Sequence, residues 1–471
     1  MLCSGYLGHD MEDDCDIIII GAGTAGIAAY KEAIKFTNNI LIINDGEWDT
    51  TCARVGCMPS KVLIAAANRM HDINTSDLVG LSVNSTIDTS NVMKHVRSLR
   101  DRFTRATLKD VNSWDENHKI SGKASFINSN TVQVNQKNYQ AKTFILAVGS
   151  TPNINQDWKD ELGELFITSD QVFELEKLPK RLAVLGSGVI AIELAQAMQR
   201  LSVVTTVFAR SKKVGSISSP ELQKLAQEII NQELDIKYKV LPDQLKRIGN
   251  EVVIQFTEND EVKEIQVDYV LNATGRTSLL NTLNLEKIDT QFNDLKNLLV
   301  NAESKQLGDY PIFIVGDAYS STPIQHEAAH EGRKATHNCL NFPGVSPIKT
   351  LVPLGIMFSS PEMAGVGKNF QWLTEHNIEF TIGFASYEKQ GRAIVNGKNK
   401  GAIEVYVDND SKRLLGAELL ATGAEHMAHL LAWVIAQQLT IDEILDNPFY
   451  HPTIEEGLRT ALKHARRQLP K

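Results

Sequence analysis

Residues 16–26 read DIIIIGAGTAG, in which four consecutive isoleucines lead directly into three spaced glycines. The apolar run predicts a buried strand, and residues 27–36 predict a helix behind the glycines. A strand, a glycine turn and a helix begin the βαβ unit of a doubly wound sheet. Gly21 permits the tight turn, Gly23 lets backbone amides approach a pyrophosphate, and Gly26 lets the helix pack on the strand. The stretch therefore predicts a dinucleotide site.

The same order of elements recurs in the middle of the chain. The strand expected at 181–185 leads into Gly186, Gly188 and Ala191, which repeat the glycine spacing with Ala in third place. Two such folds predict an α/β protein that binds two different dinucleotides. Apolar strands that end in small residues close these folds, and their ends are Gly149, Gly275 and the pair Gly316 and Asp317.

The residues that follow each second strand bear on the choice of nucleotide. An acid usually stands there to bind a ribose, but the first fold has Asn44 followed by Asp45, and the second has Ala209 followed by Arg210. The missing acid and the arginine favour NADP(H) over NAD(H), because Arg can bind a 2′-phosphate. The alternative is that Arg210 and the lysines after it form a solvated turn.

Two cysteines lie close together after the first dinucleotide unit, in the sequence CARVGCMPSK of residues 52–61. Gly56 gives the chain the freedom to bring Cys52 and Cys57 together, and a helix is expected after Pro59. The start of a helix stabilises a thiolate, and a dithiol beside a flavin can pass two electrons. Alone, such a pair would more often be two buried apolar cysteines. No second Cys pair or His cluster stands nearby, so we expect no metal.

These motifs resemble those of the pyridine-nucleotide disulfide oxidoreductases, which are flavoproteins, and are closest to those of the dihydrolipoyl dehydrogenases. The resemblance extends from about residue 16 to 459. It includes the cysteine motif, the Gly-Asp at 316–317 and the HPTIEE sequence at 451–456. Arg54 stands where the family usually has Asn, and Asp49 and Thr50 replace a usual Gly-Gly pair.

The resemblance implies a role for each catalytic residue. Cys57 would face the FAD and Cys52 would exchange with the substrate. His451 would be the general acid–base, oriented by Glu456. The family draws this pair from the partner subunit, so a homodimer is implied.

The resemblance also implies that Lys61 lies near the flavin and pairs with Glu193.

Residues 379–387, 402–408 and 413–420 alternate as in an antiparallel sheet, and helices are expected near 423–438 and 454–466. The expected domains are an FAD-binding domain of residues 1–150 and 277–345, an NAD(P)-binding domain of 151–276, and an α+β dimerisation domain of 346–471.

Charge and composition exclude several other classes of protein. The 471 residues carry a net charge of −9 with no long basic run, which disfavours nucleic acid and anionic membranes as partners. The first 15 residues carry acids rather than the basic and apolar regions of a signal peptide, so we expect a frayed tail and a cytoplasmic protein.

The expected function is therefore that of an FAD-dependent dithiol/disulfide oxidoreductase of the dihydrolipoyl dehydrogenase type. One alternative is an NADPH-dependent reductase of another disulfide, resembling glutathione reductase or a mercuric reductase without the C-terminal cysteine pair. The other is a flavoprotein that serves mainly as a structural subunit of a 2-oxo-acid dehydrogenase complex.

Overall fold

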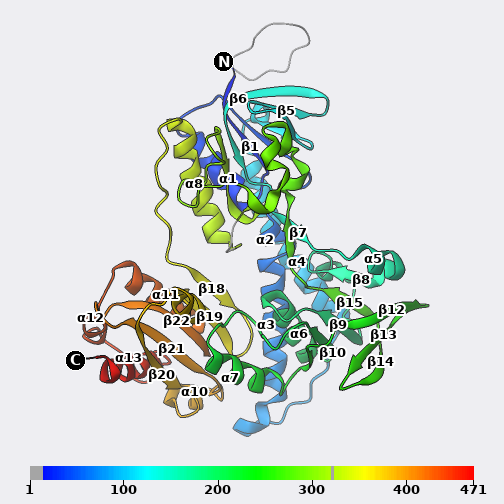
Figure 1. The fold of residues 1–471 in the computed structure, drawn as a ribbon. Coiled ribbons are helices and arrows are strands. Elements are labelled where there is room, and N and C mark those ends of the chain that lie inside the picture. Colours follow the sequence, from blue (N-terminus) through cyan, green and yellow to red (C-terminus); the bar gives the residue numbers. More distant parts are fainter. Residues whose placement is uncertain (1–13, 320–322, 471) are drawn as a thin grey trace. The chain divides into compact units, whose positions relative to one another are not determined.

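The structure is a computed structural model that describes residues 14–319 and 323–470. Most of the N-terminal tail, for which no signal peptide was expected, lies outside the described residues. The chain divides into two compact units, shown in Figure 1. The first unit comprises the residues up to 59, 97–153 and 276–350, and the second unit comprises 60–96, 154–275 and 351–471.

A parallel sheet forms the core of the first unit. Its strands follow the order β3 (Lys119–Ser121), β2 (Ile40–Asn44), β1 (Cys15–Ile20), β6 (Lys137–Leu146) and β17 (Ile312–Ile314). The first part of β6 also pairs antiparallel with β5 (Thr131–Val134), which pairs with β4 (Ser125–Asn128). This is the doubly wound arrangement expected from residues 16–26.

The isoleucine run is buried because both faces of this sheet are covered. Ile17 and Ile19 pack in one apolar cluster with α1 (Thr24–Ala33) and α8 (Gln325–Asn341). Ile18 and Ile20 pack in a separate cluster on the opposite face. A strand that is buried on both faces needs a continuous apolar sequence rather than an alternating one.

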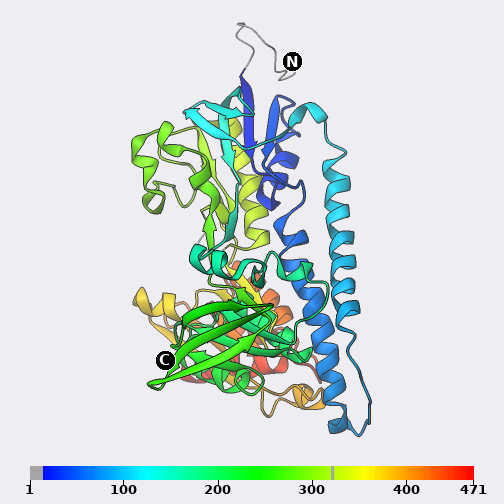
Figure 2. The same cartoon turned by 90° about the vertical axis from the view of Figure 1, so that its right-hand side faces the viewer.

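The second unit contains a second parallel sheet. Its strand order is β11 (Asp235–Tyr238), β10 (Val204–Ala209), β9 (Arg181–Leu185), β15 (Tyr269–Asn272) and β8 (Phe166–Thr168). The helices that follow β9 and β10 are α6 (Val189–Arg200) and α7 (Pro220–Ile230). An antiparallel sheet of β12 (Pro242–Ile248), β13 (Glu251–Glu258) and β14 (Glu261–Val267) is seen in green in Figure 2.

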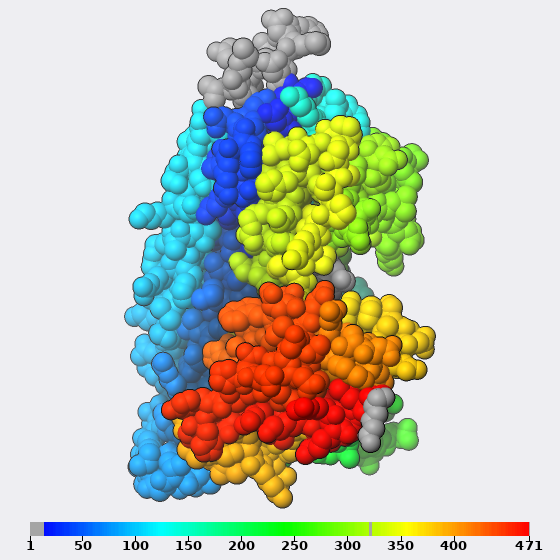
Figure 3. Space-filling model, turned by 90° about the vertical axis from the view of Figure 1, so that its left-hand side faces the viewer, coloured from blue at the N-terminus to red at the C-terminus, as the bar shows by residue number. Residues whose placement is uncertain are grey.

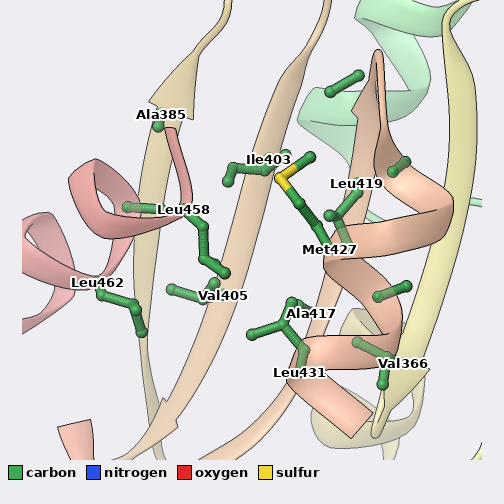
Figure 4. Close-up of a cluster of buried hydrophobic side chains, with 14 of the residues drawn as sticks. Val366, Ala385, Ile403, Val405, Ala417, Leu419, Met427, Leu431, Leu458 and Leu462 are labelled. Atoms are coloured by element: carbon green, nitrogen blue, oxygen red, sulfur yellow. The ribbon is translucent and has the colours of Figure 1, made fainter. Parts of the chain in front are cut away.

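The C-terminal residues form a third sheet, entirely antiparallel, in the second unit. Its order is β18 (Leu354–Met357), β19 (Glu362–Gly367), β22 (Leu414–Ala421), β21 (Ala402–Asp408) and β20 (Phe380–Ser386). Met427 and Leu431 of α11 (Ala424–Ala436) and Leu458 and Leu462 of α13 (Glu456–Gln468) pack on this sheet, as Figure 4 shows. The expected strands and helices of this region are confirmed to within about two residues.

The other α-helices and strands lie between these elements along the chain. They are α2 (Thr51–Arg54), α3 (Cys57–Asn74), α4 (Thr89–Val111), α5 (Gln156–Leu162), α9 (Phe370–Glu375), α10 (Gly391–Val395), α12 (Ile441–Leu445) and the paired strands β7 (Ser150–Pro152) and β16 (Arg276–Ser278). Among the described helices, none combines the length and the apolar character needed to cross a membrane.

Candidate active site

The first glycine turn joins β1 to α1 and leaves an open cradle. Gly21 has a φ of +103°, and a Cβ there would lie 2.3 Å from the carbonyl oxygen of Ala147. A Cβ on Gly26 would lie 1.8 Å from the carbonyl oxygen of Gly21. Gly23 caps α1 without a side-chain hydrogen bond, and a Cβ on Gly23 would have no atom within 4 Å. The backbone amides at this helix start are therefore accessible to an anion.

Asn44, at the end of β2, braces this turn. Its Oδ1 accepts a 2.9 Å hydrogen bond from the backbone N–H of Ala22, and its Nδ2 donates to the carbonyl of Glu47 at 2.8 Å. The Asn44 side chain is buried, whereas Asp45 is exposed. The residue that replaces the usual ribose-binding acid thus holds the glycine turn in place, a role that the sequence did not indicate.

The second glycine turn has the same geometry. Gly186 has a φ of +114°, and a Cβ there would lie 2.5 Å from the carbonyl oxygen of Ala273. Gly188 caps α6 without a side-chain hydrogen bond and has open space on its Cβ side. Ala191 is fully buried under the turn. The first turns of α1 and α6 also contain no acidic residue, so neither start repels a phosphate.

A basic loop lies against the second turn. The strand β10 ends at buried Ala209, and Arg210, Lys212 and Lys213 are exposed. Ser187 holds the loop, because its hydroxyl donates to the carbonyl of Lys213 at 2.6 Å. The loop therefore begins at the edge of the sheet where the second dinucleotide is expected.

Residues at the carboxyl ends of the other strands were also predicted to bind cofactors. Gly149 (φ +67°) follows β6 and has no atom within 4 Å of a Cβ, and Gly275 (φ +122°) follows β15. Gly316 donates its N–H to Glu331 Oε2 at 2.8 Å. Burial raises the pKa of the neighbouring Asp317, and the nearby charge of Arg276 opposes that shift.

The two cysteines lie on either side of a tight turn. Cys52 is a half-buried residue of α2, and the exposed Cys57 is the first residue of α3. A Cβ on Gly56 would lie 3.3 Å from the Cα of Cys52. The backbone therefore folds back to the first cysteine at Gly56, the residue that precedes Cys57. The helix start at Cys57 favours the thiolate form of its side chain.

An ion pair spans the cysteine turn. Arg54 Nε lies 2.9 Å from Asp49 Oδ1, and the carboxylate side chain is only 5% exposed. Burial raises the pKa of Asp49, while the Arg54 charge lowers it. These are two of the three positions, with Thr50, at which the sequence departs from the family pattern. The departures therefore belong together as one pair, which sequence reasoning did not detect.

Lys61 and Glu193 form the predicted ion pair in the second unit. Lys61 Nζ lies 2.8 Å from Glu193 Oε2, and the Glu193 side chain is 4% exposed. The other carboxylate oxygen accepts a 2.7 Å hydrogen bond from the backbone N–H of Phe358. The ammonium also lies over the Phe358 ring, 4.6 Å from its centre.

His451 and Glu456 are hydrogen-bonded at the start of α13. The imidazole Nδ1 lies 3.0 Å and 3.1 Å from the two carboxylate oxygens. Glu456 Oε2 also accepts the backbone N–H of Thr453 at 3.2 Å. The hydrogen bond with His451 is the main cause of the lowered pKa of Glu456. The His451 side chain is 82% exposed, so its other nitrogen is accessible.

Across the residues that the structure describes, no group of three or more His, Cys, Asp or Glu side chains could hold a metal ion.

Comparison with known proteins identifies the family. Residues 15–332 match the family described as pyridine nucleotide-disulphide oxidoreductase, and residues 354–462 match its dimerisation domain. A mercuric reductase of Lysinibacillus sphaericus is 26% identical over 96% of this chain and 82% of its own length. A dihydrolipoyl dehydrogenase of Mycoplasma pneumoniae is 27% identical over 96% of this chain and 98% of its own length.

Solved structures share the fold. LpdA from Mycobacterium tuberculosis superposes with a TM-score of 0.82 at 21% identity, covering 96% of this chain and 99% of its own. The flavoprotein disulfide reductase RclA from Escherichia coli gives a TM-score of 0.78 at 19% identity, covering 96% of this chain and 99% of its own. FAD and pyridine-nucleotide binding and a dimerisation domain fit these matches. The chain belongs to the pyridine nucleotide-disulphide oxidoreductase family.

Proposed function

We propose that this protein moves two electrons between a substrate dithiol of the dihydrolipoamide class and NADP(H), through Cys52, Cys57 and FAD. The cysteine turn carries this proposal. It places one half-buried and one exposed cysteine around Gly56, with the second at the start of a long helix. Two buried apolar cysteines, the alternative, would not leave Cys57 exposed.

The chain offers a suitable place for FAD in the first glycine turn. The uncapped start of α1 and the open space at Gly23 suit the pyrophosphate, and the half-buried Asp317 suits a hydroxyl-bearing chain. Bound there, FAD supplies a carrier that accepts two electrons from a dithiol and passes them to a nicotinamide. We assign residues 1–150 and 277–345 to this cofactor and 151–276 to the nucleotide.

The protein side chains exchange the sulfur bonds. In the oxidised enzyme, a substrate thiolate attacks Cys52 Sγ of the Cys52–Cys57 disulfide, and Cys57 leaves as a thiolate. The second substrate thiol then attacks the mixed disulfide, and Cys52 is released as the substrate closes its own disulfide. The substrate loses two electrons and two protons, and the cysteine pair gains the two electrons.

His451 is the base in this exchange. The carboxylate of Glu456 accepts the Nδ1–H of the imidazole, which leaves Nε2 as the proton acceptor. We propose that His451 of the partner subunit serves the cysteines of the first subunit. The dimerisation domain at residues 354–462 and the exposed imidazole support this arrangement.

Residues 346–471 are then the dimerisation domain. Part of their surface is seen in yellow to red in Figure 3. The exposed apolar side chains of α11 include Leu430 at 41% and Trp433 at 66%. We further propose a cytoplasmic location.

A second candidate is an NADPH-driven reductase of a different disulfide, and the Ala209–Arg210 pair favours it. The cysteine pair and the His451–Glu456 pair both argue against a purely structural subunit.

Steady-state assays of the holoenzyme with dihydrolipoamide and NADP⁺, and with glutathione disulfide and NADPH, separate these functions. We expect the wild type to turn over dihydrolipoamide and Cys52→Ser to abolish this turnover. Cys339→Ser, which changes a buried cysteine outside the turn, should preserve it. Turnover of glutathione disulfide alone would support the second candidate.

A further inference from the structure

Glu418 is a buried carboxylate in the middle of the C-terminal sheet. It lies on β22 and is only 1% exposed. Its two oxygens accept hydrogen bonds from the backbone N–H and hydroxyl of Ser218 and from the backbone N–H of Ser219. The N–H of Phe370 lies 3.4 Å from Oε2. A buried carboxyl group is tolerated only with such partners, so these bonds hold the segment that supplies them.

A neighbouring acid, Glu404, shares the hydroxyl of Tyr406 with Glu418. The hydroxyl of Tyr406 lies 2.8 Å from Glu418 Oε2 and 3.0 Å from Glu404 Oε2, but it has only one proton to donate. Burial raises the pKa of Glu404, which favours its neutral form, and a neutral carboxyl can donate to the phenol oxygen. Tyr406 can then donate its own proton to Glu418 Oε2, which adds a side-chain hydrogen bond to those from Ser218 and Ser219.

The partners of Glu418 end the basic loop of the second dinucleotide fold. This loop, residues 210–219, starts with Arg210 and ends with Ser219, which caps α7. Ser187 of the glycine turn makes two hydrogen bonds to the middle of this loop. Its hydroxyl donates to the carbonyl of Lys213 at 2.6 Å, and its carbonyl accepts the N–H of Gly215 at 2.9 Å. The loop is thus fixed both to the glycine turn and to the C-terminal sheet.

The middle of the loop also touches that sheet. Gly215 has a φ of +64°, and a Cβ there would lie 2.6 Å from Met363 Sδ and 2.8 Å from Met357 Sδ. These methionines belong to β19 and β18, and α7 lies next to the same sheet in Figure 1. A side chain at position 215 would displace both methionine side chains and would be strained at this positive φ, so the loop and the sheet are fitted to each other independently of Glu418.

We propose that Glu418 is a positioning residue for the pyridine nucleotide, and that it holds the loop 210–219 so that Arg210 meets the adenosine 2′-phosphate. The inference rests on the proposed nucleotide site. It assigns to the C-terminal sheet a part in nucleotide binding in addition to dimerisation. A loop released at Ser218 and Ser219 would keep its contacts at Lys213 and Gly215 but would lose its fixed end, and the free energy needed to order that end would weaken nucleotide binding.

The test compares Glu418→Gln with Glu362→Gln in the holoenzyme. Glu362 is a half-buried carboxylate on β19 that accepts the N–H of Glu425 at 2.9 Å, so its variant is a control on the same sheet outside the loop. An amide at 418 keeps the size but replaces one acceptor with a donor that faces backbone N–H groups. We expect the KM for NADPH to rise about 10-fold with little change in kcat, and flavin reduction by dithiol to be unchanged.

Limited trypsin digestion reads the loop without any nucleotide. Arg210, Lys212 and Lys213 are exposed cleavage sites, and we expect faster cleavage there in Glu418→Gln than in wild type or Glu362→Gln. If Glu418→Gln does not fold, Ser218→Ala should give a smaller change of the same kind, because it removes the 3.0 Å hydroxyl bond to Glu418 and the 3.1 Å bond that the hydroxyl accepts from the N–H of Gln371 but keeps the backbone bonds to Glu418. Unchanged cleavage and an unchanged KM in the folded variants would overturn the inference. A wild-type enzyme that binds no pyridine nucleotide would instead overturn the proposed function, whatever the loop does.

Discussion

Replacement of Arg210 should reduce the preference for NADP(H). The change is Arg210→Ala, alone and combined with Ala209→Glu, which restores the acid that bonds a ribose in NAD-dependent folds. Arg210 is exposed at the end of β10, and Ala209 is fully buried beside it. Both variants change residues where β10 meets the loop 210–219, and neither changes a residue of the cysteine turn.

The expected size of the effect follows from the exposure of Arg210. A charge-assisted hydrogen bond contributes about 1.5–3 kcal/mol, and solvent around an exposed guanidinium favours the lower value. The kcat/KM for NADPH should therefore fall about 10-fold in Arg210→Ala, with kcat/KM for NADH nearly unchanged. The double variant should prefer NADH, because the new carboxylate repels a 2′-phosphate and accepts from ribose hydroxyls.

Steady-state hydride transfer from each nucleotide measures both values. Lys224→Ala, which removes an exposed cation of α7 outside the loop, serves as the control and should leave the ratio unchanged. A wild type that already prefers NADH, together with an Arg210→Ala variant of unchanged kcat/KM, would refute the reasoning.

Three further predictions concern the remaining site residues. His451→Ala should slow thiol exchange about 100-fold in single-turnover kinetics, and Glu456→Gln should slow it less because it only orients the imidazole; equal small effects would point to another base. Mixed dimers of Cys52→Ser and His451→Ala chains should regain activity, since one of their two sites would be intact, and no recovery after verified subunit exchange would contradict a shared site. Lys61→Met should lower the free energy of unfolding by about 3 kcal/mol, because it leaves Glu193 unpaired at 4% exposure; the additional Glu193→Gln change should restore part of that loss in denaturant titrations.

Local sequence patterns were sufficient to predict most of the fold. The isoleucine run, the two glycine turns and the alternating C-terminal strands each depend on neighbouring residues, so their spacing indicated the elements. Gly21 and Gly186 have positive φ values, which is why glycine stands at both positions. The pairing of Lys61 with Glu193 could be expected only through the resemblance to a family, because 132 residues separate them.

Other contacts gave no local signal. Asn44 looked like a missing ribose acid, yet its amide braces the turn from which it is 22 residues away in sequence. Asp49 and Arg54 looked like two independent departures until the fold paired them. Ser218 and Glu418 are 200 residues apart, and no pattern in either segment predicts that they are hydrogen-bonded. Buried polar pairs of this kind depend on tertiary packing rather than on periodicity.

The absorption spectrum of the two-electron-reduced enzyme tests the central claim most directly. A Cys57 thiolate against the flavin should give a long-wavelength charge-transfer band after anaerobic reduction with one equivalent of dithionite. We predict that Cys57→Ser lacks this band and that Cys52→Ser shows it without prior reduction. A normal band in Cys57→Ser, or no band in the wild-type flavoprotein, would contradict the assignment of electron transfer to this cysteine pair.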